Sequence, residues 1–183
     1  MRENLDASLK GLVLLEGVKV TLIPGDHGGL TGYSGITNSE FQLYLFSHKL
    51  PSVPISQMTG AQAADILTEG YWEPAGCDGL PTGLDFTHFA WAVNHGLGAN
   101  KHLQAAAEAW DSLGLEDGFI GPLTLFKCST WDVNVLIERY LAIQAVHYDT
   151  IEKHDQTQLK FLKGWKNRII RTRDIVNGRP LSI

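Results

Sequence analysis

A glycine-rich segment, residues 24–35, is the feature that most constrains how this chain can fold. It follows the alternating apolar residues Val18, Val20 and Leu22. Such an alternation, followed at once by turn-forming residues, is typical of a short strand and a hairpin rather than of a helix. We therefore predict one small β-hairpin near residues 18–35.

The segments on either side of this hairpin carry helix signals. A first helix over about residues 6–16 is predicted by residues that recur at the helical period, namely Leu5, Leu9, Leu12, Val13 and Glu16. After the hairpin, apolar periodicity and capping residues predict further helices that begin near residues 38, 59, 84, 99, 122, 132 and 157. The expected fold class is mainly α.

The length of 183 residues suits one compact domain, or one domain with a fused subdomain. A soft boundary lies in the loop over residues 73–83. We predict two parts, residues 1–80 and residues 81–183, packed as one compact unit.

Charge and hydropathy limit the partners. The formal net charge is -5, so no nucleic-acid partner is expected. Seven of the 15 Lys and Arg residues lie between Lys160 and Arg179. We interpret them as a solvated helix face, with a surface for an anionic polymer or a membrane as the alternative. No segment could span a bilayer, so no stable membrane insertion is expected.

The first residues carry acids where a secretion signal needs positive charge. We therefore expect synthesis in the cytoplasm without a signal peptide. If the substrate lies outside, another component must carry the protein across the membrane.

Two carboxyl groups flank the predicted hairpin. Glu16 lies at the inner edge of an apolar helix face, near the C-terminal end, where desolvation and the helix dipole favour the neutral acid. Asp26 lies in the glycine-rich turn, where a carboxyl stays ionised, and Thr31 and Thr37 add hydroxyls. A protonated acid beside an ionised partner is the arrangement that glycoside cleavage uses. On these residues alone, however, a turn-forming role for Asp26 is favoured.

Several motifs in order add a family resemblance. Glu16-Gly17, Asp26-x-Gly28-Gly29-x-Thr31 and Gly35-Ile36-Thr37 resemble the opening of glycoside hydrolase family 108. Tyr71-Trp72 is similar to a later motif of that family. Three further stretches, near residues 86–96, 117–125 and 161–168, resemble the family's C-terminal module, called peptidoglycan-binding. The resemblance covers about residues 10–173.

This resemblance implies a lysozyme-like helical fold and N-acetylmuramidase activity on the glycan strands of peptidoglycan. Residues 1–80 would be the catalytic part and residues 81–183 the peptidoglycan-binding type of module. The family's catalytic acid falls on Glu16. By analogy with phage-type lysozymes, Asp26 and Thr31 would be the second carboxylate and a positioning hydroxyl. Family members include phage endolysins, so release through a holin, or association with a virion, is a further expectation.

The region after Glu16 departs from the family pattern. The usual Gly-Gly-Tyr is replaced by Gly17-Val18-Lys19, and one extra residue lies on each side of the glycine-rich motif. Two alternatives therefore stay open. One is a catalytically silent wall-binding or virion structural protein. The other is a lytic transglycosylase.

Further residues are weighed as substrate contacts or as structural elements. Thr37, Trp72 and Asn94 are the candidate sugar contacts, with a helix-terminal role as the alternative for Asn94. His88 and His95 share a helix face, but no tight ligand motif is present, so we expect neither a metal nor another cofactor. Cys77 and Cys128 are interpreted as idle thiols, with a disulfide left open.

Overall fold

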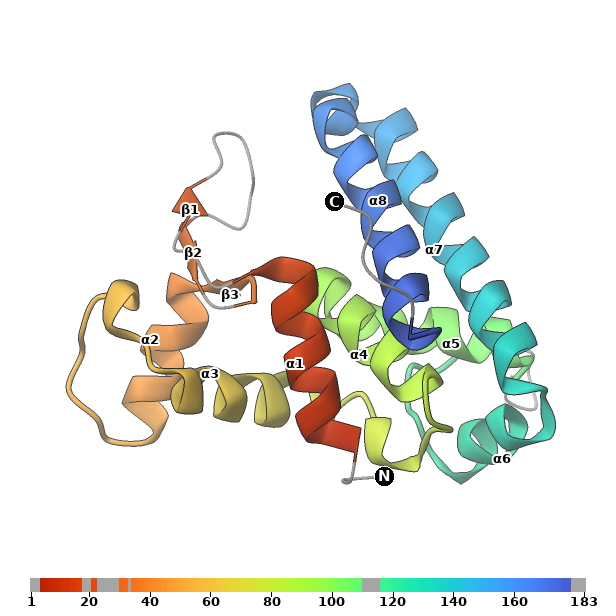
Figure 1. Cartoon of the computed structure of the whole chain (residues 1–183), viewed down its shortest axis with the longest axis horizontal. Helices are drawn as coiled ribbons and strands as arrows, with labels where there is room; N and C mark the ends of the chain where they lie inside the picture. Colours follow the sequence, from red (N-terminus) through yellow and green to blue (C-terminus); the bar gives the residue numbers. More distant parts are fainter. Residues whose placement is uncertain (1–3, 18–20, 23–29, 33, 110–115, 179–183) are drawn as a thin grey trace.

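The computed structural model describes residues 4–17, 21–22, 30–32, 34–109 and 116–178, and Figure 1 shows their arrangement. Eight α-helices lie within these ranges: α1 (Leu5–Glu16), α2 (Asn38–Ser47), α3 (Gly60–Leu67), α4 (Leu84–His95), α5 (Ala99–Ala107), α6 (Pro122–Thr130), α7 (Val133–His154) and α8 (Leu159–Val176). Short helical turns join them: η2 (Ile55–Gln57), η3 (Thr68–Trp72), η4 (Cys77–Gly79), η5 (Gly96–Gly98) and η6 (Gln156–Gln158). None of these described helices is long and apolar enough to cross a membrane.

The β element is a three-stranded antiparallel sheet of very short strands. β1 (Thr21–Leu22) pairs with β2 (Leu30–Gly32), and β2 pairs with β3 (Ile36–Thr37). The third strand follows a turn in which Ser34 and Gly35 both have positive φ. The prediction of a mainly α fold with a small hairpin near residues 18–35 is therefore confirmed.

Helix starts follow the capping chemistry of the sequence in most places. Thr59 caps α3 through a reciprocal box with Gln62, and Asp132 accepts two backbone N–H groups at the start of α7. Gly83 is the N-cap of α4, and Asp85 of the first turn accepts the backbone N–H of Gly83. An Asp in the first turn can satisfy the same orphan donors as a capping side chain.

The centre of the fold is α4. Nine of its residues are buried, in the unbroken stretch from Leu84 to Ala92. This helix packs against α1, α5, α7 and α8, so it joins the N-terminal and C-terminal parts of the chain. The buried residues form one core that includes side chains from both sides of the loop at 73–83. The division into residues 1–80 and 81–183 stays a prediction.

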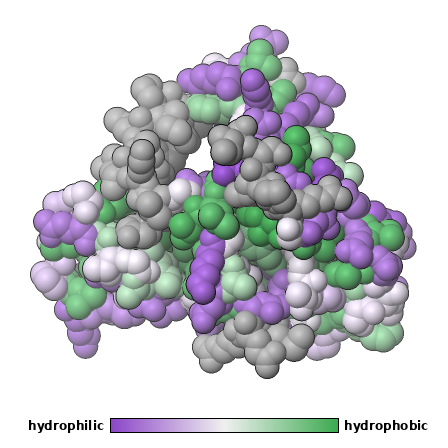
Figure 2. Space-filling model, viewed as in Figure 1, coloured by the Kyte–Doolittle hydropathy of each residue, from purple (hydrophilic) through white to green (hydrophobic). Residues whose placement is uncertain are grey.

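The buried face of α1 differs from the expected one. Leu12 and Leu15 are buried, whereas Val13 is 38% exposed and Leu14 is 58% exposed. The buried stripe is rotated by one residue because α4 and α8 meet α1 on that side. Figure 2 shows the resulting apolar surface over the upper part of α1.

Candidate active site

Glu16 is the last residue of α1 and lies where this helix meets the small sheet. Gly17 closes the helix with a φ of 82°, and its carbonyl accepts the backbone N–H of Ser34 at 2.9 Å. A Cβ on Gly35 would lie 4.0 Å from Oε2 of Glu16. Figure 1 shows the sheet and the α7–α8 pair rising on opposite sides of this end of α1. The Glu16 carboxyl therefore lies between the small sheet and the α7–α8 pair.

The Glu16 carboxylate forms an ion pair with Arg168 of α8. The Arg168 side chain is 10% exposed and that of Glu16 is 21% exposed. A second guanidinium nitrogen of Arg168 donates to the carbonyl of Ala90 at 2.7 Å, and Arg171 donates to the carbonyl of Leu14 at 2.8 Å. Two arginines of α8 therefore hold the C-terminal end of α1, where the helix dipole favours positive charge.

This ion pair corrects the expected environment of Glu16. Burial, followed by the neighbouring charge of Arg171, lowers the pKa of Arg168 to about 9, so the guanidinium stays positive at pH 7. An opposite charge in contact favours the ionised form of a carboxyl. The surroundings of Glu16 therefore differ from the predicted apolar face, because its carboxyl contacts a guanidinium.

The other two predicted catalytic residues are not located relative to Glu16. Asp26 lies outside the described residues, as do its neighbours His27, Gly28 and Gly29. The backbone of Thr31 lies in β2, opposite Thr21 and Thr37, but its side chain lies outside the description.

Thr37, predicted as a sugar contact, has a structural role at the start of α2. It is the N-cap of α2: its hydroxyl accepts the backbone N–H of Glu40 at 3.2 Å and donates to Oε2 of Glu40 at 2.6 Å. Tyr71 donates its hydroxyl to Oε1 of the same carboxylate. Burial, and then this hydrogen bond, raise the pKa of Tyr71. The Thr-x-x-Glu spacing could have revealed the capping box from sequence alone.

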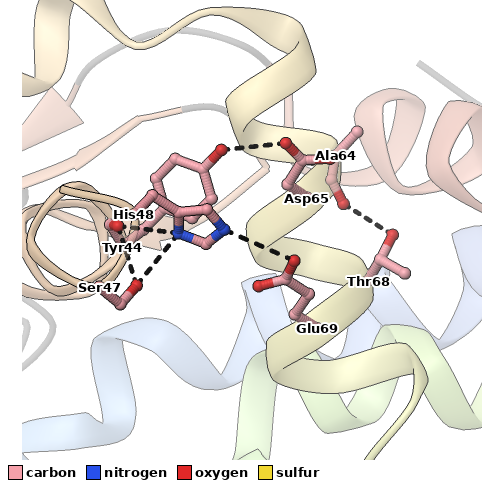
Figure 3. A network of polar contacts seen from close by, with 7 residues as sticks. All are labelled: Tyr44, Ser47, His48, Ala64, Asp65, Thr68 and Glu69. Carbon is pink, nitrogen blue, oxygen red and sulfur yellow. Dashed lines mark hydrogen bonds and ion pairs between the residues drawn. The ribbon is translucent and has the colours of Figure 1, made fainter. Parts of the chain in front are cut away.

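A cavity of about 330 Å³ lies between α2, the α3–η3 segment and η5. Its walls include the carboxylates of Glu40 and Glu69 and the rings of Tyr44 and Tyr71. Glu16 is not among the lining residues. Figure 3 shows the polar contacts that tie α2 to α3 beside this cavity, including Tyr44 with Asp65 at 3.0 Å and His48 with Glu69 at 3.8 Å. The cavity can offer hydroxyl-binding groups, but it is separate from the Glu16 carboxyl.

The other two predicted sugar contacts, Trp72 and Asn94, differ in their exposure to solvent. Trp72 is fully buried, donates to Asp78 at 2.8 Å and packs edge-on against Phe89, so the structure corrects its expected surface position. Asn94 is exposed, and its side-chain oxygen accepts the hydroxyl of Tyr148 at 2.8 Å. Asn94 therefore stays a candidate sugar contact, and Trp72 is a core residue.

Cysteines and histidines complete the predicted site residues. Cys77 and Cys128 are both free and buried. This agrees with their interpretation as idle thiols and not with a disulfide. His88 is buried between Tyr140 at 2.7 Å and Asn100 at 3.1 Å. His95 instead lies beside His102, seven residues further along the chain, and beside His147, which is distant in sequence.

Comparison with known proteins found one matching family and a similar solved structure. Residues 9–96 match the model of the family described as Glycosyl hydrolase 108. The solved structure described as "Structure of Brucella abortus SagA" is 26% identical, with a TM-score of 0.79 over 97% of this chain and 96% of that chain. No curated protein matches the chain.

The matched segment contains Glu16 and Gly35, and the family match supports a glycoside hydrolase. Residues 9–96 resemble glycoside hydrolase family 108, as predicted from the sequence motifs, and the expected lysozyme-like fold is confirmed. The assignment of residues 81–183 as a peptidoglycan-binding type of module stays a prediction.

Proposed function

We propose that this protein is an N-acetylmuramidase that cleaves the bond between N-acetylmuramic acid and N-acetylglucosamine in peptidoglycan, with Glu16 as the general acid. One observation carries the proposal. The carboxyl that corresponds to the family's acid lies at the end of α1, against Gly35 and partly open to solvent. A donor in that position can reach a glycosidic oxygen that enters from the solvent side.

The chemistry divides between two carboxyl groups. Glu16 donates a proton to the leaving oxygen as the glycosidic bond breaks. Asp26, with Thr31, stabilises the sugar cation or directs the attacking water from the other side. Gly35 leaves room for the sugar beside the Glu16 carboxyl, because it has no side chain there.

The ion pair with Arg168 adds a step to this mechanism. General acid catalysis requires the protonated carboxyl, and contact with a guanidinium opposes protonation. In our proposal the bound glycan strand separates Glu16 from Arg168 and shields the carboxyl from water. The carboxyl takes up a proton from solvent as it leaves Arg168, before the strand excludes water and the glycosidic bond is cleaved.

The substrate's own charges fit the surface beside the site. Peptidoglycan carries carboxylates, and α8 exposes Lys160, Lys163 and Lys166, of which Lys166 pairs with Asp149 at 2.8 Å. Figure 2 shows hydrophilic surface over the outer end of the α7–α8 pair. Asn94, exposed at the end of α4, is the proposed sugar contact on the same side as α7.

The decisive experiment is digestion of purified peptidoglycan by wild type and by Glu16→Gln. We expect the variant to lose roughly 10²-fold or more in turnover, since the amide cannot donate the proton. Glu108→Gln is the matched control, because Glu108 also pairs with an arginine, Arg139 at 3.0 Å, on a different surface. Near-full activity of Glu16→Gln would refute the assignment. Anhydro-muramic ends, detected by mass, would instead identify a transglycosylase.

The same ion pair favours a second candidate, a catalytically silent wall-binding or virion-associated protein. A carboxylate held permanently by Arg168 cannot act as an acid, and Arg168 is nearly buried. Incubation of wild type with purified peptidoglycan separates the two functions. Sedimentation with the wall and no new reducing ends supports the silent protein, whereas new reducing ends support the muramidase.

A further inference from the structure

Three histidines from three helices meet beside the end of α4. His95 ends α4, His102 lies in α5 and His147 lies in α7. One ring nitrogen from each can be chosen so that all three atoms lie within 4.8 Å of one another. The ring centroids are 4.2 Å apart for His95 and His147, and 5.1 Å and 5.4 Å apart for the other two pairs. This His95–His102–His147 cluster is half-buried.

Trp91 and Gly98 hold the three rings in place. The Trp91 side chain is fully buried and stacks on His102 at 4.8 Å with an interplanar angle of 9°. Its ring also lies 5.8 Å from His95 and 6.1 Å from His147. A Cβ on Gly98 would lie only 3.2 Å from Nε2 of His95. The imidazoles are therefore positioned by a rigid aromatic base and by a close backbone approach.

The polar groups of this cluster are not fully satisfied. Nε2 of His147 is buried and has no hydrogen-bond partner among the described residues. A buried ring nitrogen without a partner is costly, and a metal ion is one partner that would satisfy it. Simple aromatic packing would account for the stacking on Trp91, but not for this unpaired atom.

The rings are also in the right protonation state for a metal. Burial, followed by the charges of His147 and His102, lowers the pKa of His95 to about 4. Burial likewise lowers the pKa of His102 and of His147, with Glu116 acting in the opposite direction on His102. The neutral imidazole that a metal needs is thus the resting form at pH 7.

We propose that His95, His102 and His147 bind one Zn²⁺ ion that ties α4, α5 and α7 together. Three imidazoles and a water or small anion make a tetrahedral site, with Zn–N bonds of about 2.0–2.1 Å. Side-chain rotations that move the ring nitrogens closer together by roughly 1.5 Å would give the nitrogen spacing of a tetrahedral zinc site. Nitrogen ligands select zinc and similar transition metals over Mg²⁺ and Ca²⁺, which prefer oxygen.

The proposed zinc ligands include neither Glu16 nor Arg168. The effect of the site is structural: a bound ion would fix the end of α4, and with it the exposed Asn94. Metal binding to the folded state alone also raises thermal stability in proportion to the logarithm of metal concentration. The zinc site can therefore be present whether or not the protein cleaves peptidoglycan.

The test is a Zn²⁺ titration of the full chain, freed of any affinity tag and dialysed against a chelator. We expect one equivalent to bind, and the unfolding midpoint to rise by roughly 5–10 °C at a hundredfold excess over the dissociation constant. Co²⁺ serves as a spectroscopic probe, with the intense visible absorption of tetrahedral coordination expected. No peptidoglycan is present, so the result does not depend on the muramidase activity.

Variants identify the ligands. His102→Asn and His147→Asn should each weaken Zn²⁺ binding about 100-fold or more and remove the Co²⁺ absorption. His154→Asn is the matched control, since His154 is exposed on the same helix as His147. Absence of binding to wild type overturns the proposal even if the variants fold poorly. Equal binding by wild type and by folded ligand variants overturns it as well.

Discussion

Arg168 of α8 pairs with the carboxylate of Glu16 and at the same time donates to the carbonyl of Ala90 at 2.7 Å. One guanidinium therefore links the end of α1, the central helix α4 and the C-terminal helix α8. Arg168, which stabilises the packing of three helices, therefore also sets the charge environment of Glu16, the proposed catalytic acid. Removal of the Arg168 guanidinium should lower the free energy of unfolding, and it should make the protonated form of Glu16 easier to reach.

The stability effect can be measured with Arg168→Gln. The variant loses a buried ion pair and leaves Ala90 with a weaker partner, so we expect the free energy of unfolding to fall by roughly 1–3 kcal/mol. Partial exposure of Glu16 keeps the loss at the lower end of the range for buried pairs. Urea unfolding measures this quantity. Arg139→Gln, which breaks the exposed pair with Glu108, should cost less than about 1 kcal/mol.

The chemical effect of the same variant appears in the pH profile of peptidoglycan cleavage. Without the positive charge, Glu16 keeps its proton to higher pH, so the alkaline limb of kcat/KM should move up by about one pH unit or more. Arg168→Lys keeps the charge and should leave the limb close to its wild-type position. Identical limbs for wild type and Arg168→Gln would mean that Arg168 does not control the protonation of Glu16.

Gly35 offers a second test of the site. Gly35→Ala introduces a methyl group at a φ of 84°, next to Oε2 of Glu16. We expect stability to fall by about 1 kcal/mol and turnover on peptidoglycan to fall at least about tenfold, since the methyl group occupies the proposed sugar position. Gly178→Ala carries the same kind of strain, at a φ of 62°, with nothing within 4 Å. Equal effects of both substitutions on turnover would remove Gly35 from the site.

Local signals in the sequence predicted most of the fold, because caps and periodicity act within a few residues. Thr59 and Asp132 begin helices where their capping chemistry predicts. The rotation of α1, which exposes Val13, depends on which neighbours the helix meets, and periodicity alone does not contain that information. The Glu16–Arg168 pair arises in the same way, from the packing of two helices distant in sequence.

Thr37 allows a structural role to be separated from a role in sugar binding. Thr37→Ala removes the N-cap of α2 and should lower the free energy of unfolding by about 1 kcal/mol, whereas Thr37→Ser should restore most of it. Turnover per folded molecule should stay unchanged in both variants. A rise in KM without a loss of stability would show instead that the hydroxyl contacts the sugar.

Acid should weaken the fold through its buried histidines. Burial lowers the pKa of His88 to about 4, so between pH 6.5 and pH 4 the unfolded chain binds a proton that the folded chain does not. Stability is therefore fully present above about pH 6.5 and declines as the pH falls toward 4, by roughly 3 kcal/mol for a fully buried ring. His95, with a pKa also lowered to about 4, acts in the same direction. Urea unfolding at several pH values gives the slope, and His88→Gln should be less stable at pH 7 yet show a shallower decline. A slope unchanged by this substitution would assign the acid sensitivity to other groups.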